Sequence, residues 1–228
     1  MIKHGIDQEA LIRKFSEASA KQGEALRKAV TETTLKALQG RELSLANIKQ
    51  VLNTVAKAAS AGAAGSALPS ADVEGLLAKA VAGMDAALEK AVQANRKALQ
   101  QMVDQGADLR ETQAKKALAD IEKLEDALFA ALRKAADGAQ ASLAGPWAQV
   151  LKATQGKGTG TGAQASATIA ELMDSAQANL RRGRALGMSA SQAMLDSYST
   201  LVSGVLIGMS DALQQGGAAS PPSPSRKK

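Results

Sequence analysis

Residues 71–137 decide the fold class of this chain, and they read ADVEGLLAKAVAGMDAALEKAVQANRKALQQMVDQGADLRETQAKKALADIEKLEDALFAALRKAAD. Leu77, Leu88 and Leu99 stand eleven residues apart, Arg110 interrupts the count, and Ile121 resumes it. At about 100° per residue, these positions and their neighbours share one side of an α-helix. The predicted apolar stripe consists of Leu77, Val81, Leu88, Val92, Leu99, Val103, Ile121, Leu124, Leu128 and Leu132.

A row of lysines lies on the opposite side of the same predicted helix, at Lys79, Lys90, Lys123 and Lys134. Eleven residues in three turns is about 3.67 residues per turn, so the stripe drifts little along a straight helix. Such a helix can lie along a flat apolar surface or pack in a nearly straight bundle. It needs no left-handed coiled-coil partner.

An unbroken helix over residues 71–137 would be about 100 Å long at a rise of 1.5 Å per residue. A soluble monomer rarely leaves so long an apolar stripe bare. We therefore expect a break at Gly106 and a helix end at Gly138. A hairpin folded near Gly106 would bury one half of the stripe on the other half.

The composition argues against an enzyme. The 228 residues include no cysteine and one histidine, His4, near the N-terminus. A thiolate nucleophile, a histidine general base and a Cys- or His-based metal site are therefore not expected. Four residues are aromatic and Ala and Leu are abundant, which favours an elongated or self-associating helical protein with a thin core. We assign no catalytic residue, no metal and no cofactor.

The rest of the sequence predicts further helices joined by small-residue linkers. Residues 6–39 form the first predicted helix, Ser44 is the expected N-cap of the next, and Ser70 is the expected N-cap of the long one. The predicted regions are an N-terminal helical hairpin (1–59), a linker (60–70), a long amphipathic helical region (71–153), a Gly/Thr-rich linker (154–163), a C-terminal helical region (164–215) and a disordered basic tail (216–228).

Two glycine-containing stretches mark predicted connections. Gly145-Pro146-Trp147 predicts a turn or a helix start, followed by a short helix to about Lys152. Residues 155–162, QGKGTGTG, resemble a phosphate-binding loop only superficially, because glycine follows Lys157 and no predicted strand precedes it. We expect a flexible linker there.

The C-terminal helical region has two features of interest for binding. Arg181, Arg182 and Arg184 form a predicted basic contact cluster. Residues 197–210 contain no charge, and within them Gly204 and Gly208 form a GxxxG spacing that allows close contact between helices. Fourteen residues are too few to span a membrane, which takes about 20. We interpret this segment as a buried or self-associating helix, with surface insertion as the alternative.

The fold class predicted is all-α: an elongated, antiparallel bundle of long Ala/Leu-rich amphipathic helices with a disordered C-terminal tail. These helices, the absence of cysteine, the scarcity of aromatic residues and the Pro/Ser/Lys tail resemble phasins, small bacterial proteins that coat polyhydroxyalkanoate granules. The spacing of apolar residues eleven apart, as at Leu77, Leu88 and Leu99, is also similar to the eleven-residue repeats of lipid-surface helices. Residues 35–43 and 202–213 resemble an uncharacterised proteobacterial helical family.

Three functional hypotheses follow. In the first, a non-catalytic protein adsorbs through the stripe to an apolar or membrane-like surface, which the resemblance specifies as a polyester granule. In the second, the stripe is internal to a structural or adaptor bundle that self-associates or binds a helical protein partner. The third is nucleoid association through the arginine cluster and the basic tail. It is the weakest, because lysine and arginine do not gather on one face as in a dedicated nucleic-acid-binding domain. We expect a cytoplasmic homo-oligomer with no transmembrane span.

Overall fold

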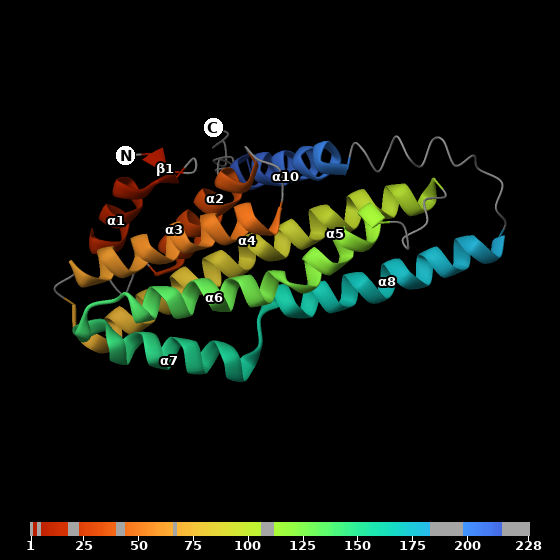
Figure 1. The fold of residues 1–228 in the computed structure, drawn as a ribbon. Helices are drawn as coiled ribbons and strands as arrows, with labels where there is room; N and C mark the ends of the chain where they lie inside the picture. The colour runs from red at the N-terminus through yellow and green to blue at the C-terminus, as the bar shows by residue number, and fades with distance from the viewer. Residues whose placement is uncertain are drawn as a thin grey trace, which may run out of the picture.

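The computed structural model describes residues 2–3, 6–17, 23–39, 44–65, 68–105, 112–182 and 198–215. The described chain is an elongated bundle of helices (Figure 1), which confirms the all-α prediction. Two-residue strands, β1 (Ile2–Lys3) and β2 (Ile6–Asp7), pair antiparallel before the first helix. The helices are α1 Gln8–Glu17, α2 Gly23–Gln39, α3 Leu45–Ala64, α4 Ser70–Asp104, α5 Thr112–Glu122, α6 Leu124–Asp137, α7 Ala141–Lys157, α8 Gly160–Arg182 and α10 Tyr198–Gln215.

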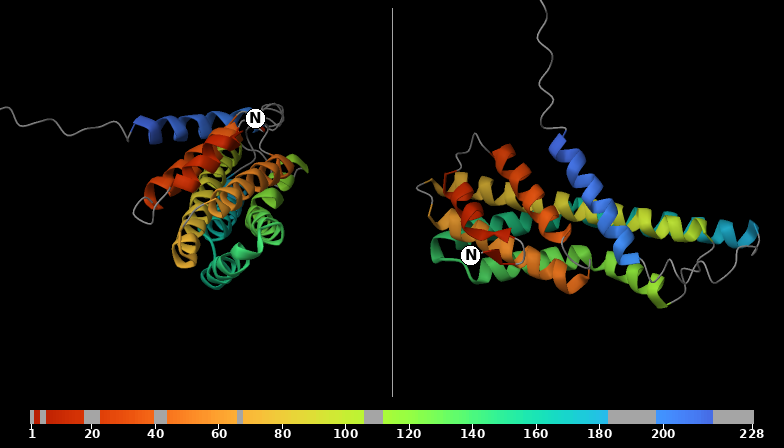
Figure 2. Two further views of the ribbon diagram at one scale, coloured as in Figure 1. Left: turned by 90° about the vertical axis from the view of Figure 1, so that its left-hand side faces the viewer. Right: turned by 90° about the horizontal axis from the view of Figure 1, so that it is seen from above.

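The 35-residue helix α4 is the centre of the bundle. Its main neighbours are α2 and α8, and it also packs on α10, α7 and α3. Small side chains at Ala80, Ala87, Ala91, Ala94 and Ala98 are completely buried, so neighbouring helices can approach α4 closely from several sides. The two views in Figure 2 show the other helices arranged around it. The buried part of α4 is therefore wider than the single stripe that the sequence predicts.

The long helix is broken near Gly106, as predicted. Helix α4 ends at Asp104, α5 begins at Thr112, and the chain then runs back along the bundle (Figure 1). Gly106 itself lies outside the described residues. Gly138 is the C-cap of α6, also as predicted. We expected the two halves of the apolar stripe, before and after Gly106, to bury each other, and this is wrong for their main contacts. Helix α6 packs chiefly on α3, whereas α4 packs chiefly on α2 and α8.

The N-terminal third differs from the prediction in its helix boundaries. The predicted helix over residues 6–39 is two helices, α1 and α2. Ser44 caps α3 as expected, with the Asn47 backbone N–H donating to Ser44 Oγ at 3.4 Å. The predicted linker over residues 60–70 begins too early, because α3 continues to Ala64. Ser60 is part of the packed structure, since its hydroxyl accepts a hydrogen bond from Trp147 Nε1 at 3.1 Å.

The expected N-cap at Ser70 is wrong by one residue. Pro69 is the N-cap of α4 and Ser70 is the first helical residue, with Asp72 in the first turn. The expected turn or helix start at Gly145-Pro146-Trp147 is also wrong, because α7 begins at Ala141 and continues through Pro146 to Lys157. Pro146, Trp147 and Val150 are all buried, and this burial offsets the backbone hydrogen bond that proline cannot donate.

Candidate interaction surface

All ten residues of the predicted stripe lie in the core, and none is more than 3% exposed. Leu77, Leu88 and Leu99 of α4 are completely buried, as are Leu128 and Leu132 of α6. The periodicity therefore identified the buried side of these helices. In this conformation the stripe contacts other helices of the same chain, and it offers no face to an external surface.

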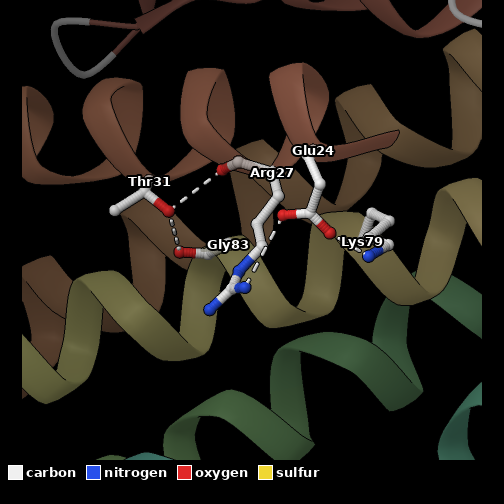
Figure 3. Close-up of polar contacts among 5 residues, drawn as sticks. All are labelled: Glu24, Arg27, Thr31, Lys79 and Gly83. Carbon is white, nitrogen blue, oxygen red and sulfur yellow. Dashed lines mark hydrogen bonds and ion pairs between the residues drawn. The ribbon is translucent and has the colours of Figure 1, made fainter. Parts of the chain in front are cut away.

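The contact between α2 and α4 is close because Gly83 has no side chain (Figure 3). A Cβ atom added at Gly83 would lie 2.7 Å from the Arg27 carbonyl oxygen and 2.8 Å from Val30 Cβ, which is too short for a stable contact. The carbonyl of Gly83 accepts a hydrogen bond from Thr31 Oγ1 at 3.1 Å. Gly83 therefore fixes where the two helices cross, a role that sequence reasoning missed.

An ion pair lies beside this crossing at the surface. Lys79 Nζ of α4 donates to Glu24 Oε1 of α2, as Figure 3 shows. This hydrogen bond and the positive charge of Lys79 lower the pKa of the Glu24 carboxyl group. The Glu24 side chain is largely exposed and that of Lys79 is partly exposed, so solvent screens the pair and it contributes little to stability. The row of lysines that includes Lys79 thus partly faces α2.

The predicted flexible linker at 154–163 is a well-defined helix junction instead. Helix α7 ends at Lys157, Gly158 has a φ of 71°, and α8 begins at Gly160. Asp85 of α4 caps α8 from outside that helix. Its two carboxylate oxygens accept hydrogen bonds from the backbone N–H groups of Gly160 at 2.8 Å and Thr161 at 2.9 Å.

Two threonine hydroxyls complete this junction. Thr161 Oγ1 donates to Asp85 Oδ1 at 2.6 Å, and Thr159 Oγ1 donates to Glu125 Oε1 of α6 at 2.6 Å. A carboxylate at the N-terminus of a helix is favoured by the free N–H groups and by the helix dipole. The junction therefore ties α8 to both α4 and α6. The acids come from 75 and 34 residues earlier in the chain, so no local sequence signal could have shown the pairing.

Helix α10 docks on α4 and α2 through one of its sides. Val202 and Leu206 are completely buried, and the Tyr198 hydroxyl donates to Asn95 Oδ1 of α4. Gln39 Nε2 of α2 donates to the Leu206 carbonyl oxygen at 3.0 Å. Burial, and then the negative charge of Asp120, raise the pKa of the Tyr198 phenol. These contacts fix which side of α10 points away from the bundle.

The side of α10 that points away contains the two glycines predicted to mediate helix contacts. Gly204 and Gly208 are exposed, and a Cβ atom added at either would meet nothing within 4 Å. Thr200 is also exposed, and Ile207 is 46% exposed. Of the predicted buried or self-associating segment, the side with Val202 and Leu206 is buried, and the side with Gly204 and Gly208 is exposed. Their contact with a helix of another molecule stays a prediction.

We call Thr200, Gly204, Ile207 and Gly208 the α10 face. It contains no charged residue, and Asp211 marks its end. Within the described part of the chain, Met173 of α8 is the other large apolar side chain that is strongly exposed, at 52%. The α10 face therefore combines exposure, small residues and absence of charge.

The remaining predicted contacts can be placed only in part. Arg181 and Arg182 are the last two residues of α8, and Arg184 lies outside the described residues, as do His4 and the tail at 216–228. Among the residues that the structure describes, no group of three His, Cys, Asp or Glu side chains is arranged to hold a metal ion. None of the described helices is long and apolar enough to cross a membrane.

A model of a protein family of unknown function, DUF6781, matches residues 1–215. The chain belongs to this family. No curated protein matches it. No solved structure matches it either. The match covers every described element, so the bundle and the α10 face both lie within the extent of the family.

Proposed function

We propose that this protein is a non-catalytic helical scaffold that acts by self-association, and that the α10 face is its contact surface. The observation that carries the proposal is the outward orientation of Gly204 and Gly208 on a docked helix. This is the second of the three hypotheses from the sequence. The partner we propose is a second copy of the chain.

The burial of the stripe supports a scaffold over a surface-adsorbing protein. Leu77, Leu88 and Leu99 would each contribute about 1.5–3 kcal/mol on burial, and the bundle already provides that burial. Adsorption to a polyester granule through the stripe would require the helices to separate first. The granule-coat hypothesis therefore involves an additional opening step, which self-association through the α10 face does not.

The chemistry of the α10 face supports contact with another helix. Glycines spaced by four residues form a shallow groove along one side of a helix, so a second backbone can approach closely and bury Ile207. A two-fold axis through the groove would bring the same residues together from both copies. Because the face is uncharged, no like charges are brought together at its centre.

The net charge of the chain predicts how self-association depends on ionic strength. The formal net charge is +6, so two copies repel each other at long range. Salt screens this repulsion, and self-association through an uncharged face should therefore strengthen as ionic strength rises. Binding to a nucleic acid would weaken under the same change. The sign of the salt dependence separates the second hypothesis from the third.

The test is sedimentation equilibrium of the full chain and of Gly204→Gln and Gly208→Gln variants. Glutamine fills the groove without adding charge or a large apolar group. We expect the wild type to associate reversibly and each variant to associate at least tenfold more weakly. Gly75→Gln is the matched control, because Gly75 of α4 is exposed and also has open space around it.

Two results would reject the proposal. One is a wild-type chain that stays monomeric throughout the micromolar range. The other is association that both α10 variants retain in full. Co-sedimentation with polyhydroxybutyrate particles and anionic liposomes is measured in parallel. Saturable binding of a monomeric chain to either particle would favour the surface hypothesis instead.

A further inference from the structure

Asn95 is an exception on the buried side of α4. It interrupts one of the apolar rows that run in elevens, between Met84 and Ala117, yet it is only 6% exposed. Among the described residues of α4 it is the one buried polar side chain. A buried amide is costly unless its hydrogen bonds are satisfied. The structure shows how both ends of this amide are satisfied.

The two ends of the Asn95 amide have different partners. Its nitrogen, Nδ2, donates to the Ala91 carbonyl oxygen one turn earlier in α4, at 2.8 Å. Its oxygen, Oδ1, accepts the hydrogen bond of the Tyr198 hydroxyl, which comes from the first residue of α10. Tyr198 is the single tyrosine of the chain. The Asn95 amide oxygen therefore needs a hydrogen-bond donor from α10, and the Tyr198 hydroxyl is that donor.

The other contacts of α10 define its position along α4 only in part. Val202, Leu206 and Ser210 are buried at intervals of four residues, which is about one helical turn. If α10 moved by four residues, Leu206 would take the place of Val202 and that apolar contact would remain, while Ser210 would take the place of Leu206. The hydrogen bond from Gln39 would also survive, because it goes to a backbone carbonyl and every residue of the helix has one.

We propose that the Asn95–Tyr198 pair sets the register of α10 on the bundle, and thereby turns the α10 face outward. A shift of one turn would leave the Asn95 amide oxygen buried without its donor, which disfavours every register except the observed one. The pair thus acts as a positioning device. Its consequence for association depends on the proposed function, whereas the register itself does not.

The test measures register directly, with spin labels at Gln101→Cys of α4 and Asp211→Cys of α10. Both positions are exposed, and the chain has no native cysteine to compete for the label. Labelled chains are diluted with unlabelled chains, so that only distances within one molecule are recorded. We expect a single narrow distance distribution in the labelled chain that keeps Asn95 and Tyr198.

The decisive variant replaces the polar pair by apolar residues of similar shape, Asn95→Leu with Tyr198→Phe. We expect its denaturation midpoint to be equal or higher, because a buried polar pair is often replaceable by apolar side chains. The distance distribution should nevertheless broaden or split, with a second population whose mean differs by up to about 6 Å, because a shift of four residues moves α10 by that much along its axis. Self-association should weaken at least fivefold.

A matched control is Gln39→Met, which removes the other side-chain hydrogen bond to α10 but should leave one narrow distribution. If the double variant does not fold, Tyr198→Phe alone decides, and it should broaden the distribution with a lowered midpoint. A narrow, unshifted distribution in the folded Asn95→Leu, Tyr198→Phe chain would overturn the proposal. The labels measure distances within one chain. An unshifted α10 can therefore be distinguished from a loss of self-association.

Discussion

Helices α4 and α10 both contain glycines, but one glycine of α4 is packed against a neighbouring helix and those of α10 point away from the bundle. Gly83 of α4 faces α2, and even one added carbon there would lie 2.8 Å from Val30 Cβ. Gly204 and Gly208 of α10 point away from the bundle, and no described residue lies within 4 Å of a carbon added at either. The same residue type permits a close helix contact in both places. At Gly83 the second helix belongs to the same chain, whereas no helix that the structure describes lies against the α10 face.

The two helices therefore differ in how many of their sides are packed against other helices. Helix α4 is surrounded, so almost any change to its buried side must disturb a neighbour. Helix α10 is held by one side, so changes on its outer side should leave the monomer folded. Each of the predictions below tests that difference, starting with the largest expected effect.

A charge placed in the stripe should have the largest effect. Leu88 of α4 is completely buried, and Leu88→Asp would leave a carboxylate without a partner in the core. We expect the free energy of unfolding to fall by at least about 4 kcal/mol. Urea denaturation followed by circular dichroism measures the change. A variant nearly as stable as the wild type would mean that the stripe faces solvent.

The helix crossing should respond to a single added methyl group. Gly83→Ala forces α2 and α4 apart and weakens the Thr31 hydrogen bond, so we expect a loss of about 2–3 kcal/mol. Gly75→Ala on the same helix is the control, and it should raise stability because its added carbon meets nothing. Equal effects at the two positions would contradict the described crossing.

The cap of α8 should matter less than the crossing. Asp85→Ala removes the acceptor for the first backbone N–H groups of α8, which should cost about 1–2 kcal/mol. Hydrogen exchange should show faster opening of the first turn of α8. Asp174→Ala, at an exposed position in the middle of α8, should leave that first turn as protected as in the wild type.

Alkaline pH should loosen the docking of α10. Because burial favours the neutral phenol and raises the pKa of Tyr198 above its ordinary value of 10.0, docking of α10 is fully stabilised below pH 10. That stabilisation is lost as the pH rises toward the raised pKa. Absorbance at 295 nm follows this single tyrosine. Ionisation near pH 10 in the folded chain would contradict the buried position of its hydroxyl.

The smallest expected effect is a gain. Gly204→Ala and Gly208→Ala should each raise the free energy of unfolding of the monomer by about 0.5–1 kcal/mol, because alanine favours the helix and has room. Thermal unfolding at low protein concentration measures this. A destabilised monomer would show that the α10 face is packed against the bundle after all.

The sequence was sufficient for the features that depend on periodicity. The spacing in elevens predicted which apolar residues of α4, α5 and α6 share a face, and all ten proved to be buried. Ser44 and Gly138 marked their helix ends because caps are local signals. The break near Gly106 followed from the length of an unsupported helix. These features need no knowledge of which helices meet.

The features that the sequence missed depend on contacts between distant residues. Residues 160–162 read as a flexible linker, but Asp85 lies 75 residues away and turns them into a capped helix start. Pro146 read as a boundary, but burial of Trp147 keeps α7 continuous. Gly83 and Asn95 looked like ordinary helical residues or interruptions. Only the neighbouring helices α2 and α10 give them a role.

The central claim is that the stripe is internal and the α10 face is the contact surface. The most direct measurement compares the alkylation rate of Val92→Cys, at a completely buried position, with that of Ile207→Cys at increasing protein concentration. We expect the thiol at 92 to be unreactive at every protein concentration. The thiol at 207 should react readily in dilute protein and become protected as the chain associates. A thiol at 207 that reacts equally at all concentrations, beside a reactive thiol at 92, would contradict this claim.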